Sequence, residues 1–314
     1  MSDMAATRDG YGQALLEMAG DEKVVVLEAD LGKSTKSVLF RKAHPERTIS
    51  CGIGEQNMML IGAGLASSGY KPFASTFAIF TERGFEQVRN GIARPNLAVH
   101  ICGSHGGTHT GTDGGSAQSI EDLAIYRTLP NMTVMHPSDY ISAMSLTKQC
   151  LGLSGPSYMR TARNKTIKLY SDEAEITIGK ANIIRHGGAV AIIACGVLVG
   201  ESLEAADALA AEGIEAMVID MHTLKPLDND AINRAVDNCG CLVTAEDHSV
   251  IGGLGGAVAE YICANQPVPL EMVGVKDRFG ESAQSDEMLE MMGLTSKHIA
   301  AAARRAIQRK ENNR

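Results

Sequence analysis

The chain has 314 residues, a length that favours two domains, each large enough to bury its own core. Apolar residues make up 44% and charged residues 21%, which excludes a disordered or fibrous chain. The net charge of -8 offers no basic surface for nucleic acid or an anionic membrane, so an anionic ligand must be held by local charges.

Apolar, β-branched runs alternate with helical periodicity along the whole chain. In the first half we predict strands at 24–30, 71–77, 97–102 and 132–136, and helices near 56–67, 82–93 and 138–150. In the second half we predict strands at 189–195, 216–221 and 242–246, and helices near 198–212, 228–236 and 254–263, followed by an Ala-rich terminal helix with a polar, basic end. Buried strands spaced by helices indicate parallel sheets covered on both faces, with ligands beyond the carboxyl ends of the strands.

A polar stretch of mixed charge, residues 161–179, separates the two series of strands. It holds no long apolar run, so we interpret it as the link between two successive α/β domains, each with a mostly parallel sheet. The predicted domains are 1–172 and 178–314.

Cysteine usage and the first residues favour a cytoplasmic protein. The seven cysteines are odd in number and mostly lie in apolar runs, which is typical of reduced core residues. The first ten residues carry neither a basic nor an apolar stretch that would direct secretion. The longest uncharged apolar run, about 187–200, is too short to span a membrane.

Two glycine-containing segments do not satisfy the requirements of a nucleotide site. Segment 32–35, Gly-Lys-Ser-Thr, is similar to the end of a P-loop, but Leu27 stands where that motif requires glycine. The glycines of 251–256 come late in the chain without an opening βαβ unit, so a turn or helix packing explains them better.

The loop after the predicted strand 97–102 is a candidate binding loop. Residues 103–115 contain six glycines together with His105, His109 and Asp113. They follow a strand at the edge where a parallel sheet presents its ligand, although a flexible surface loop has the same composition. No cysteine or carboxylate completes a recognised metal spacing, so no metal site is predicted in this chain.

Glu55 lies between a turn of small residues and an apolar helix. From spacing alone, a carboxylate that stabilises the helix N-terminus is the simplest explanation. A carboxyl group at the edge of an apolar environment is also suited to proton transfer.

Four segments of the first half stand in a characteristic order: 52–58 (Gly-Ile-Gly-Glu-Gln-Asn-Met), 75–80 (Ser-Thr-Phe-Ala-Ile-Phe), 111–115 (Gly-Thr-Asp-Gly-Gly) and 129–139 (Leu-Pro-Asn-Met-Thr-Val-Met-His-Pro-Ser-Asp). In order and spacing they resemble the pyrimidine-binding domain of the transketolase family of thiamine-diphosphate enzymes. Segments 220–228 and 275–282 resemble that family's C-terminal domain, so the resemblance covers essentially the whole chain.

The resemblance implies that Glu55 is the catalytic residue that hydrogen-bonds the aminopyrimidine ring of thiamine diphosphate and favours its imino tautomer. Phe80 matches the aromatic residue that stacks on this ring, and Phe77 lies beside it. The other cofactor contacts that the resemblance implies are Asp30, Leu31 and Arg83, the last of which stands where transketolases usually carry tyrosine.

The implied reaction is transfer of a two-carbon ketol unit from a phosphorylated or sulfonated ketose to an aldose phosphate, with the cofactor as electron sink. The substrate contacts that the resemblance implies are His105, Asp113 and Arg160, and Arg163 is a candidate for a second contact to the anion. A guanidinium fork suits phosphate or sulfonate. Ala117 replaces a histidine usual in transketolases and deoxyxylulose-phosphate synthases, which puts the usual pentose phosphates in question; His109 is a candidate replacement.

The family's Gly-Asp-Gly…Asn motif, which holds the diphosphate through Mg²⁺, does not occur in this sequence. The resemblance therefore implies the smaller subunit of a split transketolase. A separate N-terminal diphosphate-binding subunit would complete the site for thiamine diphosphate and hold its Mg²⁺ or Ca²⁺. The two kinds of subunit would form a heterotetramer.

Other functions stay open at this stage. Within the superfamily they are the beta subunit of a 2-oxo-acid dehydrogenase and a deoxyxylulose-phosphate-synthase-like enzyme. Arg160 and Arg163 favour an enzyme of anionic sugars over a 2-oxo-acid dehydrogenase. Ala117 disfavours a deoxyxylulose-phosphate synthase, which usually has histidine there. From other classes they are a nucleotide-binding oxidoreductase and an inactive scaffolding subunit.

Overall fold

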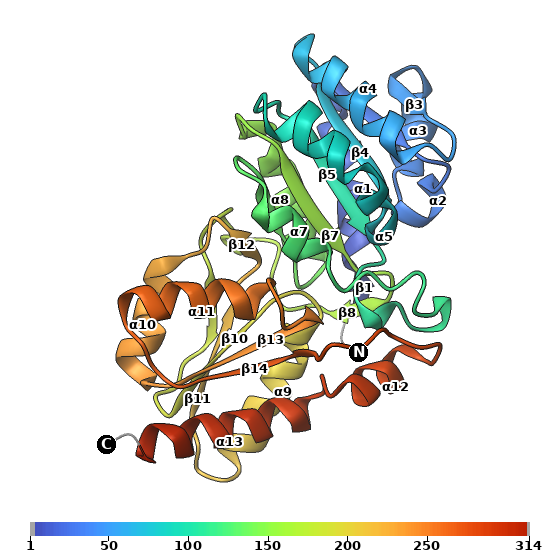
Figure 1. The fold of residues 1–314 in the computed structure, drawn as a ribbon. Helices are drawn as coiled ribbons and strands as arrows, with labels where there is room; N and C mark the ends of the chain where they lie inside the picture. The colour runs from blue at the N-terminus through green and yellow to red at the C-terminus, as the bar shows by residue number, and fades with distance from the viewer. Residues whose placement is uncertain (1–3, 313–314) are drawn as a thin grey trace.

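The computed structural model describes residues 4–312, so predictions for the first three and last two residues lie outside it. Figure 1 shows two α/β units in succession along the chain, each built on one mostly parallel sheet. The predicted class of fold is confirmed. Within the described range, no helix combines the length and apolar character that crossing a membrane requires.

The first sheet has seven strands in the order β12-β6-β7-β5-β4-β2-β3. Their bounds are β2 Val24–Glu28, β3 Thr48–Ser50, β4 Lys71–Phe77, β5 His100–Ser104, β6 Thr133–Met135, β7 Ser157–Thr161 and β12 Thr223–Lys225. All neighbours are parallel except β12, which runs antiparallel to β6. Because β12 comes from the second half of the chain, this sheet crosses the predicted domain boundary.

Helices cover both faces of the first sheet. One face carries α1 (Thr7–Glu17), α3 (Val38–Ala43) and α8 (Tyr140–Gln149). The other carries α4 (Glu55–Ser67), α7 (Asp122–Thr128) and the irregular segment 82–93. That segment was predicted as one helix, but it is a 3₁₀ turn, the short α6 (Phe85–Gln87) and a π-helix over Val88–Ala93.

The second sheet has the order β14-β13-β10-β11-β9, with only β9 antiparallel. Its strands are β9 Asn182–Arg185, β10 Val190–Ala194, β11 Ala216–Asp220, β13 Leu242–Ser249 and β14 Leu270–Val275. Alternate residues of β10 face two cores, because successive side chains of a strand point to opposite faces. The helices α10 (Asn229–Cys239) and α11 (Leu254–Asn265) cover one face; α9 (Leu198–Ala210) and α13 (Ser296–Asn312) cover the other (Figure 1).

The two units share a core. One apolar cluster runs from Leu27 and Tyr158 of the first sheet to Ile193 and Ile219 of the second. Between the units, β1 (Met4–Ala6) pairs with β8 (Lys165–Ile167), and α12 (Ser285–Met292) packs near the loop after β5. The segment between β8 and β9 contains the predicted boundary at 172–178.

Gly196 is a tight contact between the two units. It has a φ of 58° and its amide donates to the carbonyl of His136 at 3.2 Å. A Cβ at this position would overlap the His136 imidazole. Close approach and backbone conformation therefore both require glycine here.

We predict that Gly196→Ala lowers the free energy of unfolding by several kcal/mol. A left-handed alanine costs roughly 1–2 kcal/mol, and the steric overlap adds roughly 1–3 kcal/mol. Gly213→Ala is the matched control, because Gly213 has a φ of 79° but no atom within 4 Å of an added Cβ. Urea denaturation of both variants checks this; equal losses would contradict the close packing of His136 on Gly196.

Candidate functional site

The predicted site residues gather at the carboxyl edge of the first sheet. Asp30 follows β2, Phe77 ends β4 and His105 follows β5. These three strands are neighbours in the sheet and run parallel, so their carboxyl ends meet. The order of the strands thus brings together residues that are far apart in the sequence.

Glu55 is the first residue of α4 and only 4% exposed. The nearest cation is Arg83, whose Nη1 lies 3.7 Å from the carboxylate. Among residues 4–312 no donor makes a hydrogen bond to the Glu55 carboxylate. The Arg83 guanidinium also lies over the ring of Phe80, 4.8 Å from its centroid. The largely buried carboxylate and the Phe80 ring therefore share the Arg83 guanidinium as a neighbour.

Three rings form a continuous stack at this edge. The rings of Phe77 and Phe80 lie 5.7 Å apart and nearly parallel, at 7°. Phe77 also stacks on the imidazole of His105, with 3.9 Å between centroids and 20° between planes. The stack links the residues predicted for the cofactor to a residue predicted for the substrate.

His105 is held as a neutral imidazole of defined tautomer. Its burial, together with the charges of Arg8 and Arg163, lowers its pKa to about 3. Nε2 lies 3.4 Å from Nη1 of Arg8, and Nδ1 lies 2.8 Å from the hydroxyl of Ser104. Because a guanidinium can only donate, Nε2 is the acceptor and Nδ1 carries the proton.

Two guanidinium groups approach His105. Arg163 donates from Nη1 to the carbonyl of Thr110 at 3.0 Å and pairs with Asp113 at 3.3 Å. Arg8, in the first turn of α1, donates from Nη1 to the carbonyl of Ser34 at 3.0 Å. The Nε of Arg8 is buried and has no partner among the residues described. Sequence reasoning missed Arg8, because neither α1 nor any motif marked that segment.

The structure corrects the role given to Arg160. This residue is completely buried in β7 and forms an ion pair with Asp122, which is also completely buried. Its Nε donates to Asp122 at 2.9 Å, Nη1 to the carbonyl of Asp247 at 2.6 Å and Nη2 to the carbonyl of Ser119 at 3.3 Å. Because each nitrogen already has a partner inside the protein, Arg160 is not presented to a substrate.

The two remaining predicted cofactor contacts lie in a tight turn. Asp30 is exposed and has a φ of 60°, and Leu31 is half-buried just before α2 (Gly32–Thr35). A Cβ on Gly32 would overlap the Glu28 carboxylate, so the turn is pressed against the end of β2. Both residues lie at the same edge as Phe77, but the structure shows no contact that assigns them a role.

His109, the candidate replacement for the histidine missing at Ala117, is buried beside a separate cavity. Burial lowers the pKa of its imidazole, although the negative charges of Asp247 and Asp286 act to raise it. It lines a cavity of about 260 Å³ whose other walls include residues of α9 and α12. Ala117 itself is half-buried and its amide donates to the carbonyl of Gly114.

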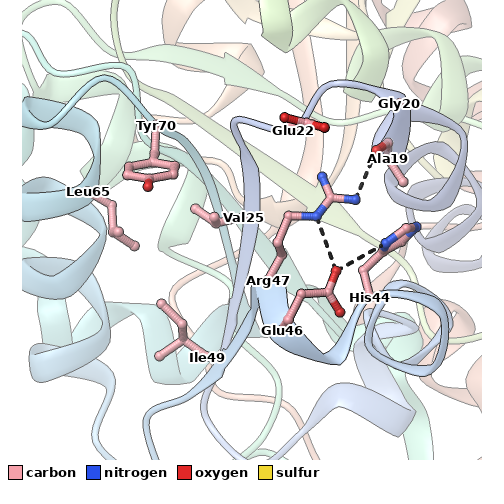
Figure 2. A pocket seen from close by; sticks show the side chains of 10 residues that line it. All are labelled: Ala19, Gly20, Glu22, Val25, His44, Glu46, Arg47, Ile49, Leu65 and Tyr70. Carbon is pink, nitrogen blue, oxygen red and sulfur yellow. Dashed lines mark hydrogen bonds and ion pairs between the residues drawn. The ribbon is translucent and has the colours of Figure 1, made fainter.

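A cavity of about 760 Å³ lies elsewhere (Figure 2). It is lined by Val25 near the start of β2, Leu65 near the end of α4 and Tyr70 just before β4, so it opens at the amino ends of the strands. Arg47 at its centre donates to the carbonyls of Ala19 and Asp21. None of the predicted site residues lines this cavity. Across the described range, no cluster of three or more His, Cys, Asp and Glu is placed to hold a metal ion.

Arg160 and Arg163 differ in burial, so their removal should affect the stability of the protein differently. We predict that Arg160→Met lowers the free energy of unfolding by about 3–5 kcal/mol, because Asp122 is left buried and unpaired. The half-exposed Arg163→Met should change it by less than about 1 kcal/mol. Urea denaturation of both variants checks the difference; a stable Arg160→Met protein would contradict the structural role.

The chain matches two family descriptions in succession. The first is "Transketolase, pyrimidine binding domain" over residues 3–168. The second is "Transketolase, C-terminal domain" over residues 179–299. Together they cover most of the chain in the order that the sequence motifs implied.

Some similar proteins align with this chain over nearly their whole length. The chain is 42% identical over 305 residues to a 6-deoxy-6-sulfo-D-fructose transketolase subunit of Clostridium sp. (strain MSTE9), covering 96% of this chain and 95% of that protein. It is 43% identical over 298 residues to a Methanocaldococcus jannaschii protein described as a transketolase C-terminal section, covering 93% of each. A solved split gene transketolase, an inactive beta4 tetramer, aligns with a TM-score of 0.91 and 45% identity over 97% of this chain and 99% of that one. The chain therefore belongs to the transketolase family of transferases and has the domains of the C-terminal subunit of a split transketolase.

Proposed function

We propose that this chain, together with an N-terminal diphosphate-binding subunit, transfers a two-carbon ketol unit from a ketose with a terminal phosphate or sulfonate to an aldose phosphate. The observation that carries the proposal is the juxtaposition at one sheet edge of a buried carboxylate, an aromatic stack and two arginines. Thiamine diphosphate, on which the family depends, supplies the electron sink for breaking the carbon–carbon bond.

Glu55 and Phe80 fit an aminopyrimidine ring. The Phe80 face offers a stacking surface, and such ring contacts are worth about 0.5–1.5 kcal/mol beyond the area they bury. The Glu55 carboxylate, without a hydrogen-bond donor among the described residues, is free to accept from a ring nitrogen and hold its proton. Phe77, Asp30 and Leu31 complete the proposed cofactor wall, with Arg83 beside the carboxylate.

Arg8 and Arg163 fit the terminal anion of the sugar. Nη1 of Arg8 lies 3.4 Å from the His105 imidazole, and Arg163 donates to the carbonyl of Thr110, whose hydroxyl donates to the carbonyl of His105. The buried, unpartnered Nε of Arg8 is a donor that an anion would satisfy. Asp113, paired with Arg163, would accept from a sugar hydroxyl. Both phosphate and sulfonate suit this donor set, and the clostridial relative is named for a sulfonated ketose.

The partner subunit would complete the site next to Glu55. Two large apolar side chains flank Glu55 in the sequence and are exposed, Ile53 by 76% and Leu60 by 49%. Because the chain lacks the family's diphosphate motif, we assign the Mg²⁺ or Ca²⁺ to that partner and propose a heterotetramer. All seven cysteines are free thiols, which fits the cytoplasm.

Removing the carboxylate tests the assignment of Glu55. We predict that Glu55→Gln lowers kcat/KM of the assembled enzyme by at least about 100-fold, because general acid–base groups contribute roughly 10²–10⁴-fold. Glu86→Gln, on an exposed glutamate of α6, should leave activity unchanged. Steady-state assays with the partner subunit and thiamine diphosphate check this; full activity of Glu55→Gln would refute the proposal.

Removing either arginine tests the anion site. We predict that Arg8→Met and Arg163→Met each raise KM for fructose 6-phosphate or 6-deoxy-6-sulfofructose by roughly tenfold or more, since a hydrogen bond to a charged group is worth about 1.5–3 kcal/mol. KM for erythrulose, a ketose without a terminal anion, should change little. Arg305→Met on α13 is the control. Equal KM changes for charged and neutral donors would place the anion elsewhere.

A further inference from the structure

One carboxylate of the second sheet holds the loop that carries the proposed substrate residues. Asp247 lies in β13, and its Oδ1 accepts from the amide of Thr108 at 2.8 Å and from the Thr108 hydroxyl at 2.7 Å. Its Oδ2 accepts from the amide of His109 at 2.8 Å. Asp247 and Thr108 are both buried. Three hydrogen bonds to a buried charge fix the backbone of the loop over 105–113 against the other domain.

Two glycines allow the loop to come this close. A Cβ on Gly107, whose φ is 82°, would lie 2.6 Å from Cγ of Asp247. A Cβ on Gly106 would lie 2.6 Å from Cδ of Arg160, which itself donates to the Asp247 carbonyl. The loop is therefore packed against Asp247 and Arg160 at distances that only glycine permits.

The anchored residues connect directly to the groups that would bind the sugar. The hydroxyl of Thr110 donates to the carbonyl of His105 at 2.7 Å. The carbonyl of Thr110 accepts from Nη1 of Arg163, and the hydroxyl of Thr112 lies 3.2 Å from the same nitrogen. Movement of the anchored backbone would displace His105 and Arg163 together.

We propose that Asp247 is a positioning residue, through which the C-terminal domain sets the affinity of the enzyme for the anionic end of the ketose. This inference rests on the proposed function. Glu55 and Phe80 lie on α4 and α5 (Ala78–Thr81), outside the loop, so the chemistry at the cofactor should be affected much less than sugar binding.

Graded removal of the anchor in the assembled enzyme tests the proposal. Thr108→Val removes only the hydroxyl donor, and we expect KM for fructose 6-phosphate to rise roughly three- to tenfold with kcat within about twofold. Asp247→Asn should raise KM further, because its amide nitrogen cannot accept from His109. Thr108→Ser keeps the hydroxyl and should behave as the wild type. KM for erythrulose should rise less than KM for fructose 6-phosphate in Thr108→Val and Asp247→Asn.

Hydrogen exchange of the isolated chain gives a readout that does not depend on activity. Amides of 105–113 should exchange faster in Thr108→Val and Asp247→Asn than in the wild type, while the strands of both sheets keep their protection. Unchanged exchange in this loop, or an equal rise in KM for both donors, would overturn the inference. A wild-type complex without ketol transfer would instead refute the proposed function, and the exchange data would then decide whether Asp247 anchors the loop.

Discussion

The buried ion pair between Arg160 and Asp122 is the interaction around which the two domains are assembled. Both side chains are fully buried, and the hydroxyl of Tyr158 also donates to Asp122 at 2.5 Å. Two buried charges are tolerated only when each is paired and its remaining hydrogen-bonding capacity is met. Arg160 meets that condition by reaching the carbonyls of Ser119 and Asp247, so it joins β7, the approach to α7 and the second sheet.

The position of the site follows from this junction. The loop after β5 cannot extend away from the sheet, because Gly106 packs on Arg160 and Gly107 on Asp247. It must turn back over the carboxyl edge, where His105 meets the ring of Phe77. Within this chain, the second domain thus shapes the proposed substrate side of the site, whereas the proposed cofactor contacts all lie in the first domain. Pairing of β12 with β6 and the shared apolar core fix the two sheets relative to each other.

Sequence patterns predicted the strands that are continuous apolar runs. They missed elements whose polar residues are buried because side chains far along the chain pair with them. The bounds of β4 were predicted correctly, but β7 was missed because a buried strand containing Arg160 does not have a continuous apolar run. Helix α1 was missed because Gly10 and Gly12 lower helical propensity. The structure shows why they are glycines: a Cβ on Gly10 would lie 3.2 Å from the Cβ of Ala143, and one on Gly12 would overlap Lys36.

The same limit explains the error about the arginines. Resemblance to a family identified the residue types of the site, and Glu55, Phe77 and Phe80 do lie together at one edge. It could not tell Arg160 from Arg163, because their difference is one of burial. Arg160 is the fourth residue of β7, inside the sheet, whereas Arg163 lies two residues beyond its end. A correct prediction of where β7 ends would have favoured Arg163 as the substrate contact, since ligands bind beyond the carboxyl ends of strands.

Local charges explain how an acidic protein could bind the proposed anionic substrate. A net charge of -8 repels anions at long range, but salt screens this repulsion beyond about 8–10 Å. Within that distance Arg8 and Arg163 dominate, and their charges, together with burial, lower the pKa of His105 to about 3, so that the imidazole is neutral. A protonated ring would add a third positive charge in a buried place. An anion bound between the arginines would offset their charges and so raise the pKa of His105. The neutral imidazole therefore lets two cations stand close together before the ligand arrives.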